Sequence, residues 1–267
     1  MTKIQNQVAQ TTAAVAPKKA MNDLLTKMEG EIKKALAGAI STEKFTRIVM
    51  SAVSANPDLA NCTQSSFLGA VMTAAQLGLE PNSAIGACYI IPRKNKGEMT
   101  AQFQLGYKGM IDLAYRSGDV ESISAHIVYA NDEFEYEYGI NPNLKHVPAL
   151  SDRGEAIAAY AVVKLKNGGT MFEIDSLANI RDFAIKKSVS FSAGYSSPWK
   201  TDFESMALKT MVKRVLKYAP ISTDFQRGLS NDETIKNEIN ADMSEVQDDT
   251  IYDADYEEVT REVTNND

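Results

Sequence analysis

Tyr107 and Lys108 stand side by side between two glycines, Gly106 and Gly109. Because glycine has no side chain, the backbone at such a position can come close to a partner. The pair would present an aromatic ring and a cation together at that point. Single-stranded nucleic acid is bound by this combination, with cations along the phosphates and aromatic rings against the bases. These residues therefore predict one part of a nucleic-acid groove.

Further cations gather in other places along the chain. A basic turn precedes the pair at 93–97, and near the end of the folded part lysines recur every four residues from Lys209 to Lys217, so that they form one stripe on a helix. Such a stripe is often only a solvated face, but its recurrence beside aromatic residues favours DNA binding. Many of those aromatics are expected to belong to the core, and Trp199 more than any other. The predicted DNA contacts are Arg93, Lys94, Lys96, Tyr107, Lys108, Arg116, Lys186, Lys187, Phe191, Trp199, Lys209, Lys213 and Arg214.

The Tyr107–Lys108 pair lies where a strand is expected to change into a helix. Residues alternate from Gln102 as in a strand, and after Gly106 the apolar residues take helical spacing up to Gly118, a typical helix C-cap. Three amphipathic helices precede this element, and Ser41 is the expected N-cap of the second. We expect this element and the Lys209–Lys217 helix to form the two walls of the groove.

The rest of the chain alternates between strand and helix patterns. The predicted strands are 84–91, 99–105, 120–129, 133–138, 156–166 and 170–174, with Pro142 and Pro148 marking a loop. Asn167-Gly168-Gly169 is a strong hairpin signal. Helices are expected over 175–187 and from Pro198 to Tyr218, separated by a loop of small residues.

One strand carries a strict alternation that allows two interpretations. Phe134, Tyr136 and Tyr138 fall on one face, and Glu133, Glu135 and Glu137 fall on the other. Carboxylates in a row can hold a metal ion, but on one strand face they diverge. We therefore favour a solvated or partner-facing edge.

The charge is divided unevenly along the chain. The whole chain carries −7, but residues 231–267 contain 13 acidic and two basic residues, which leaves 26 basic and 22 acidic residues before them. A body of +4 and a tail of −11 point to nucleic acid for the body and to partner binding or self-masking for the tail. We predict a disordered segment over 1–20, a single DNA-binding domain over 21–230 and a disordered acidic tail over 231–267. The fold class is α+β, with a helical N-terminal part, central antiparallel β-hairpins with packed helices and a long basic C-terminal helix.

Several kinds of chemistry have no motif in this sequence. No Walker or dinucleotide-binding glycine pattern occurs, and His126 and His146 lack neighbours at metal-ligand spacing, so no cofactor and no metal are expected. Cys62 and Cys88 suggest a reducing compartment. With neither a signal peptide nor an apolar run that could span a bilayer, the expected location is the cytoplasm.

Four segments together resemble the RecT family of phage recombinases. They are 77–81 (LGLEP), 104–118 (QLGYKGMIDLAYRSG), 132–136 (DEFEY) and 198–210 (PWKTDFESMALKT), and the match runs in order from about residue 40 to 222. The resemblance implies a protein, not an enzyme, that anneals complementary single strands without ATP, in helical filaments or rings, in a bacterial host. It also implies single-stranded DNA and the annealed duplex, other copies of the chain, a phage 5′-to-3′ exonuclease and the host single-strand-binding protein as partners. Carried over by motif, Tyr107, Lys108 and Arg116 would lie at the groove, and Lys209 would open the basic helix.

Two other classes of function stay open at this point. A metal-dependent nuclease is the first, because Glu31-Ile32-Lys33 matches a nuclease-like Glu-x-Lys, although it falls in an amphipathic helix. The second is an assembly protein that does not bind DNA, whose basic face packs against acidic strands such as 133–137.

Overall fold

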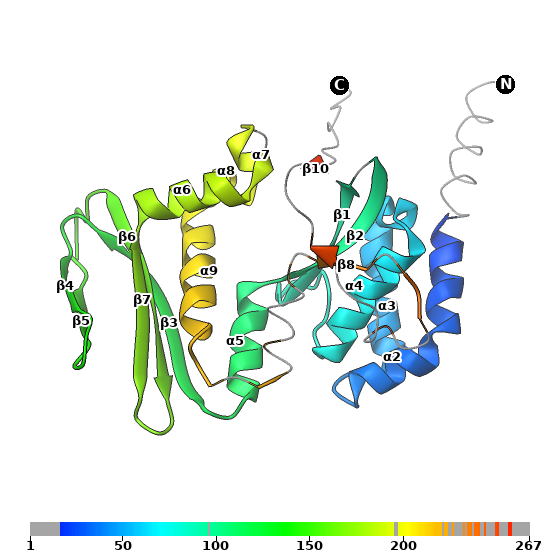
Figure 1. The fold of residues 1–267 in the computed structure, drawn as a ribbon, viewed down its shortest axis with the longest axis horizontal. Coiled ribbons are helices and arrows are strands. Elements are labelled where there is room, and N and C mark those ends of the chain that lie inside the picture. Colours follow the sequence, from blue (N-terminus) through cyan, green and yellow to red (C-terminus); the bar gives the residue numbers. More distant parts are fainter. Residues whose placement is uncertain are drawn as a thin grey trace. The chain divides into compact units, whose positions relative to one another are not determined.

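The chain forms two compact units, Met1–Gly109 with Thr223–Asp267, called unit 1 here, and Met110–Ser222, called unit 2. The structure is a computed structural model that describes residues 17–95, 97–194, 197–220, 222–223, 226, 232, 234–236, 238–240, 243, 249–250 and 256–257. Both units combine helices with antiparallel strands, which confirms the α+β class (Figure 1). The single domain expected over 21–230 is thus divided, and the boundary falls inside helix α5 (Tyr107–Arg116).

Unit 1 begins with helices whose apolar stripes are buried as the spacing predicts. Its elements are a helical stretch over 17–27, α2 (Glu29–Leu36), α3 (Thr42–Ala55), the short η1 (Pro57–Asn61) and α4 (Gln64–Gln76). Ser41 caps α3, since its hydroxyl accepts a hydrogen bond from the Lys44 amide at 3.4 Å. Residues 17–20, which the sequence placed in a disordered segment, are helical, and residues 1–16 lie outside the described part.

Of these helices, α4 and η1 pack on one hairpin, β1 (Cys88–Asn95) with β2 (Glu98–Leu105). The hydroxyl of Ser66 in α4 accepts a hydrogen bond from the Ala101 amide at 2.9 Å, which fixes the helix to β2. The first strand starts four residues later than predicted because Asn82, at φ +54°, holds the preceding loop in place. Its side chain bonds both the amide and the carbonyl of Ile90.

Unit 2 is built on a sheet of β3 (Val120–Tyr129), β6 (Ala156–Leu165) and β7 (Thr170–Ser176), in the order β3-β6-β7. The predicted hairpin at 167–169 joins β6 to β7, and the amide of Leu165 donates to the Gly169 carbonyl at 2.8 Å. Helix α9 (Phe203–Leu216) packs against one face of this sheet (Figure 1).

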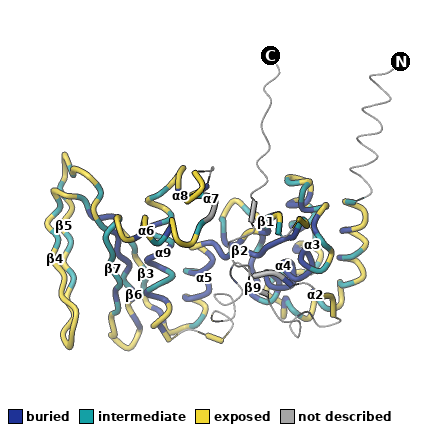
Figure 2. The backbone as a smooth tube through the Cα atoms, turned by 45° about the horizontal axis from the view of Figure 1, so that its top comes forward, coloured by how far each residue is buried: buried dark blue, intermediate teal, exposed yellow. Residues whose placement is uncertain are grey.

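A second hairpin, β4 (Glu133–Glu137) with β5 (Asn143–Val147), lies on the other side of that sheet (Figure 1). The sequence predicted β4 with its alternation but placed a loop where β5 runs. The two prolines that suggested the loop stand just outside the strand, at Pro142 and Pro148. Figure 2 shows that this hairpin is exposed or half-buried along its length, whereas each strand of the sheet also contains buried residues.

Short helices connect the sheet to α9. They are α6 (Leu177–Lys187), α7 (Val189–Ser192) and α8 (Pro198–Thr201). The prediction of a single helix from Pro198 to Tyr218 is wrong, because the helix is interrupted at Asp202. The carboxylate of Asp202 accepts a hydrogen bond from the Ser205 amide at 3.3 Å, so a new helix starts there.

Parts of the predicted acidic tail are docked on unit 1. Asp232 is buried and its carboxylate accepts a hydrogen bond from the Leu105 amide at 2.9 Å. Lys236 is buried too, and its aliphatic stem lies where a side chain on Gly69 of α4 would be, 2.8 Å from that Cβ position. Three short strands lie in this part of the chain, β8 (Thr234–Ile235) paired with β9 (Asp249–Thr250), and β10 (Tyr256–Glu257) paired with β1. The tail is therefore not disordered throughout.

Candidate nucleic-acid interface

The turn between β2 and α5 is fixed by backbone contact within unit 1. The Gly106 amide donates to the Ala87 carbonyl at 2.9 Å. A Cβ on Gly106 would lie 2.1 Å from the Gly86 carbonyl oxygen, and one on Gly109 would lie 2.1 Å from that of Ala87. The sequence predicted close approach at both glycines but left the partner open. The structure shows that this partner includes the protein's own loop at 86–87.

This turn presents Tyr107 and Lys108 to solvent. Tyr107 is 40% exposed and Lys108 is exposed as well. Two further apolar side chains that the sequence reasoning missed lie on the adjoining loop and strand, Ile85 at 64% and Tyr89 at 38% exposure. Tyr89 could have been found from β1, where it points outward between the buried Cys88 and Ile90. Unit 1 therefore has exposed aromatic rings beside a lysine, as a base-stacking surface requires.

The predicted basic turn belongs mostly to strand β1. Arg93 and Lys94 pair with Thr100 and Met99 of β2, so only residues 96–97 are left for the turn. Lys94 is exposed and Arg93 is half-buried, while Lys96 lies outside the described residues. Backbone pairing places Glu257 of β10 opposite Lys94. The acidic C-terminal segment and the predicted DNA-binding hairpin thus meet in the same unit.

The cations of α9 in unit 2 are less exposed than their spacing suggested. Lys209 and Lys213 are half-buried. Arg214 forms an ion pair with Asp175 at 2.6 Å, and its guanidinium lies 5.3 Å from the centre of the Phe183 ring. Burial raises the pKa of the Asp175 carboxyl, but its hydrogen bonds with Arg214 and Asn179 outweigh this effect and lower the pKa overall. Arg214 therefore has a structural role whether or not it also contacts DNA.

Trp199 is 9% exposed and lies in an aromatic cluster of unit 2. Its ring centre is 5.9 Å from Phe203, 6.4 Å from Phe191 and 6.5 Å from Phe183. This geometry agrees with the expectation that Trp199 is the first of the predicted aromatics to belong to the core. Phe191 is half-buried in the same cluster.

The remaining predicted contacts of unit 2 lie on helix ends. Lys186 and Lys187 are exposed in the last turn of α6. Arg116 pairs with Asp112 one turn earlier in α5, at 2.5 Å. The structure thus groups most candidates in two sets, one at the β1–β2 hairpin and the start of α5 and the other on α6–α9, while Arg116 stands at the end of α5. A groove formed by both sets stays a prediction.

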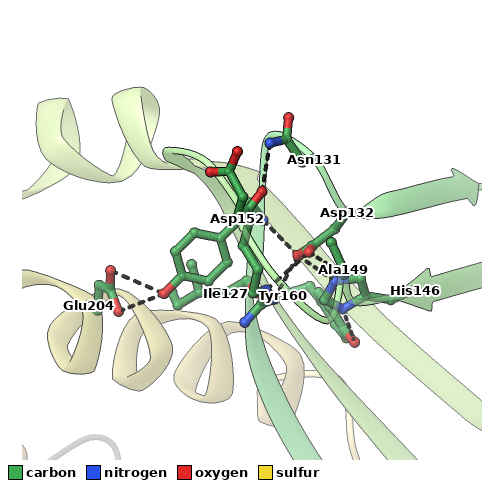
Figure 3. Close-up of polar contacts among 10 residues, drawn as sticks. Ile127, Asn131, Asp132, His146, Ala149, Asp152, Tyr160 and Glu204 are labelled. Carbon is green, nitrogen blue, oxygen red and sulfur yellow. Dashed lines mark hydrogen bonds and ion pairs between the residues drawn. The ribbon is translucent and has the colours of Figure 1, made fainter.

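A polar network that the sequence did not reveal lies at the base of the β4–β5 hairpin (Figure 3). The buried Asp132 carboxylate accepts hydrogen bonds from the Arg153 guanidinium at 2.6 and 3.0 Å and from the Tyr129 and Ala149 amides at 2.9 Å. His146 bridges Asp132, at 3.0 Å, and the hydroxyl of Tyr160, at 3.1 Å. The Arg153 hydrogen bonds, followed by those of the Tyr129 amide, His146 and the Ala149 amide, hold the pKa of Asp132 well below its usual range despite burial.

This network serves to fix the hairpin, since its groups satisfy one another. It joins the start of β4, strand β5 and strand β6, and Tyr129 extends it to Glu204 of α9 through a hydroxyl hydrogen bond at 3.3 Å. Within the described residues, no group of three or more His, Cys, Asp or Glu side chains is placed to hold a metal ion. The partners lie far apart in the sequence, so spacing gave no signal.

Comparison with known proteins identifies the relatives of this chain. The model of the RecT family matches residues 43–250. The chain is 40% identical to Protein RecT of Escherichia coli (strain K12) over 210 residues, which is 77% of either chain. It is 30% identical to the uncharacterized protein YqaK of Bacillus subtilis (strain 168) over 213 residues, 77% of this chain and 70% of the relative. Among the helices that the structure describes, none is long and apolar enough to cross a membrane.

Proposed function

This chain is a member of the RecT family, and we propose that it anneals complementary single DNA strands without ATP, as an oligomer bound to DNA. Membership of the family supports a role in recombination and strand annealing. The observation that carries the proposal is the exposed Tyr107–Lys108 pair on a turn fixed by backbone contact. A fixed turn loses little conformational entropy on binding, so more of the free energy of its contacts with DNA contributes to affinity.

The proposed mechanism divides the work between protein and DNA. Cations at the β1–β2 hairpin and on α5 hold the phosphates of one strand, and the rings of Tyr107 and Tyr89 support its bases. The other base edges remain accessible, so a second strand is tested by Watson–Crick pairing. Sequence specificity then comes from pairing, because phosphate contacts carry no sequence information.

Replacing Lys108 with alanine tests the groove in unit 1. The variant should bind single-stranded DNA more weakly and anneal more slowly. Its salt slope, the steepness with which the logarithm of the binding constant falls with the logarithm of the salt concentration, should decrease by roughly 0.7 for one lost phosphate contact. Lys33→Ala is the matched control, since Lys33 is an exposed lysine on α2 outside the predicted site. If Lys108→Ala anneals like the control across a salt series, the groove assignment is wrong.

Replacing Lys213 with alanine tests the second set in the same assay. The residue is half-buried, so unfolding by urea should be measured alongside DNA binding. Normal stability with a reduced salt slope supports a phosphate contact in unit 2. Normal stability with an unchanged slope removes α9 from the proposed groove.

A net charge of +4 before residue 231 limits how strongly one copy can hold DNA. Binding should therefore depend on several copies side by side, and it should be cooperative and dependent on strand length. A hyperbolic isotherm on long strands would contradict this. We further propose a phage 5′-to-3′ exonuclease, which produces the single strands, and the host single-strand-binding protein as partners. Pull-down with the purified partners tests each contact.

A further inference from the structure

The β4–β5 hairpin has two unlike faces. Its inner face packs on the sheet of unit 2, with the Phe134 ring centre 5.7 Å from Tyr160 and the Tyr138 ring centre 4.9 Å from Phe172. The Tyr138 hydroxyl also accepts a hydrogen bond from the Ile174 amide at 3.1 Å. The side chains of the opposite face, called the outer hairpin face below, are all exposed. They are Glu133, Glu135, Glu137, Asn143, Lys145 and Val147.

The outer hairpin face combines negative charge with exposed apolar surface. Its three carboxylates and one ammonium group leave a net charge of −2, and Lys145 is paired with Glu133. Val147 is 48% exposed, and Leu150, three residues further on, is fully exposed. The outer hairpin face thus presents carboxylates next to an exposed apolar side chain.

The helices on the other side of the sheet carry the opposite charge. Residues 177–217 contain eight basic and three acidic residues, a net charge of +5. Within them α6, which packs beside α9 on β6 and β7, exposes Lys186 and Lys187 next to Ile185, itself 47% exposed. Figure 1 shows the hairpin and α9 on opposite sides of the sheet. Because the sheet lies between them, the acidic and basic surfaces of one unit 2 cannot meet.

We infer that the outer hairpin face binds α6 of a second copy of this chain. In this contact the carboxylates of Glu135 and Glu137 lie against the ammonium groups of Lys186 and Lys187. The two carboxylates stand two residues apart on one strand face, about 7 Å from each other, a span that two neighbouring lysine side chains can reach. The assignment gives both lysines a protein contact in place of the DNA contact predicted from their charge alone.

Apolar contact completes this interface. Val147, which stands opposite Glu133 at one end of the outer hairpin face, packs against Ile185 of the second copy. The two surfaces differ and lie on opposite sides of unit 2, so the contact is head-to-tail. A head-to-tail contact adds copies in one direction, which gives an open helical chain or, if the rotation closes, a ring. The contact between copies does not require the proposed function. Only assembly of the copies along a DNA strand rests on it.

A charge swap in the full chain tests the contact. Glu135→Lys/Glu137→Lys should weaken self-association by at least about tenfold, because like charges then face each other. Lys186→Glu/Lys187→Glu should do the same, and the variant with all four changes should recover assembly towards the parent. Glu121→Lys/Glu155→Lys is the control, since it changes the net charge equally at exposed carboxylates outside the outer hairpin face. Sedimentation velocity, without DNA and on a long oligothymidylate strand, measures the assembly.

The outcomes separate this inference from the proposed function. Weakened self-association in both double variants, with recovery in the fourfold variant, supports the contact. Parent-like assembly of Glu135→Lys/Glu137→Lys overturns it, and so does the failure of the fourfold variant to recover. Annealing of long complementary strands by the parent reports on the proposed function. If the parent does not anneal them, the proposed function fails, while the measurements without DNA still decide the contact.

Discussion

Replacing Gly109 with alanine sets two opposing effects against each other in α5. In an open helical position alanine is more favourable than glycine by roughly 0.8–1.0 kcal/mol. At Gly109, however, the new Cβ would lie 2.1 Å from the carbonyl oxygen of Ala87. Real Cβ atoms essentially never come within 3.0 Å of such an atom, so the helix and the loop must separate by 0.9 Å.

The clash should exceed the gain in helix propensity. Inserting a methyl group into a closely packed site typically costs about 1–3 kcal/mol. The obstacle here is backbone, which moves less easily than the end of a side chain, so the upper part of that range applies. After subtraction of the helix gain, we expect Gly109→Ala to lower the free energy of unfolding by roughly 1–2 kcal/mol. The displaced turn should also slow annealing, since it carries Tyr107 and Lys108.

Urea unfolding of the full chain measures this difference. Gly30→Ala in α2 is the matched control. Nothing lies within 4 Å of the new Cβ, so this substitution changes helix propensity without a steric clash. We expect this control to be at least as stable as the parent, by up to about 1 kcal/mol. A Gly109→Ala variant as stable as Gly30→Ala, with an unchanged denaturant slope, would refute the packing of the turn against Ala87.

Three further predictions concern the docked C-terminal segment and the hairpin network. Gly69→Ala should destabilise the full chain, because its Cβ would meet the stem of Lys236, and replacing Lys236 with glycine should remove most of this loss in a double-mutant cycle of urea unfolding. Truncation after Met243 removes nine acidic residues and one basic residue but leaves Lys236 in place. If the tail masks the groove, the affinity for single-stranded DNA should rise, and unchanged affinity in a salt series excludes masking. Because the pKa of Asp132 is depressed in the folded state, its contribution to stability is present above about pH 4 and is lost as the pH falls further. Thermal unfolding should therefore show a weaker acid dependence in Asp132→Asn than in the parent, and equal slopes would contradict this.

Local patterns were sufficient to predict many elements of the fold. Strand β3 was predicted with its bounds, because apolar and polar residues alternate along it and glycine stands just before it. Strand β5 was missed, since only Leu144 and His146 face inward and the strand depends on pairing with β4. The break at Asp202 was missed as well, because helical apolar spacing continues on either side of it and only Asp202, the N-cap of α9, interrupts the helix.

The sequence predicted which residues belong to the candidate site, but not which parts of the protein those residues contact. Glycines flanking Tyr107 and Lys108 indicated close approach, yet a glycine pattern cannot say which backbone comes near. The same limit applies to charges, because the ion pair of Arg214 with Asp175 joins residues 39 positions apart. Composition also misled in the tail, where the excess of acidic residues hid the buried Asp232 and its hydrogen bond with β2.

Assembly and DNA binding should reinforce each other in this protein. Arg116 and Arg214 are paired within unit 2, so they are less available for phosphates than the sequence suggested. If Lys186 and Lys187 bind a second copy as well, fewer cations per copy hold DNA, and each copy alone binds weakly. Both the phosphate contacts and the contact between copies are electrostatic and weaken with salt. The salt slope per bound copy should therefore be steeper on long strands, where both contacts form, than on a strand that holds one copy. Equal slopes would mean that the contact between copies does not depend on charge.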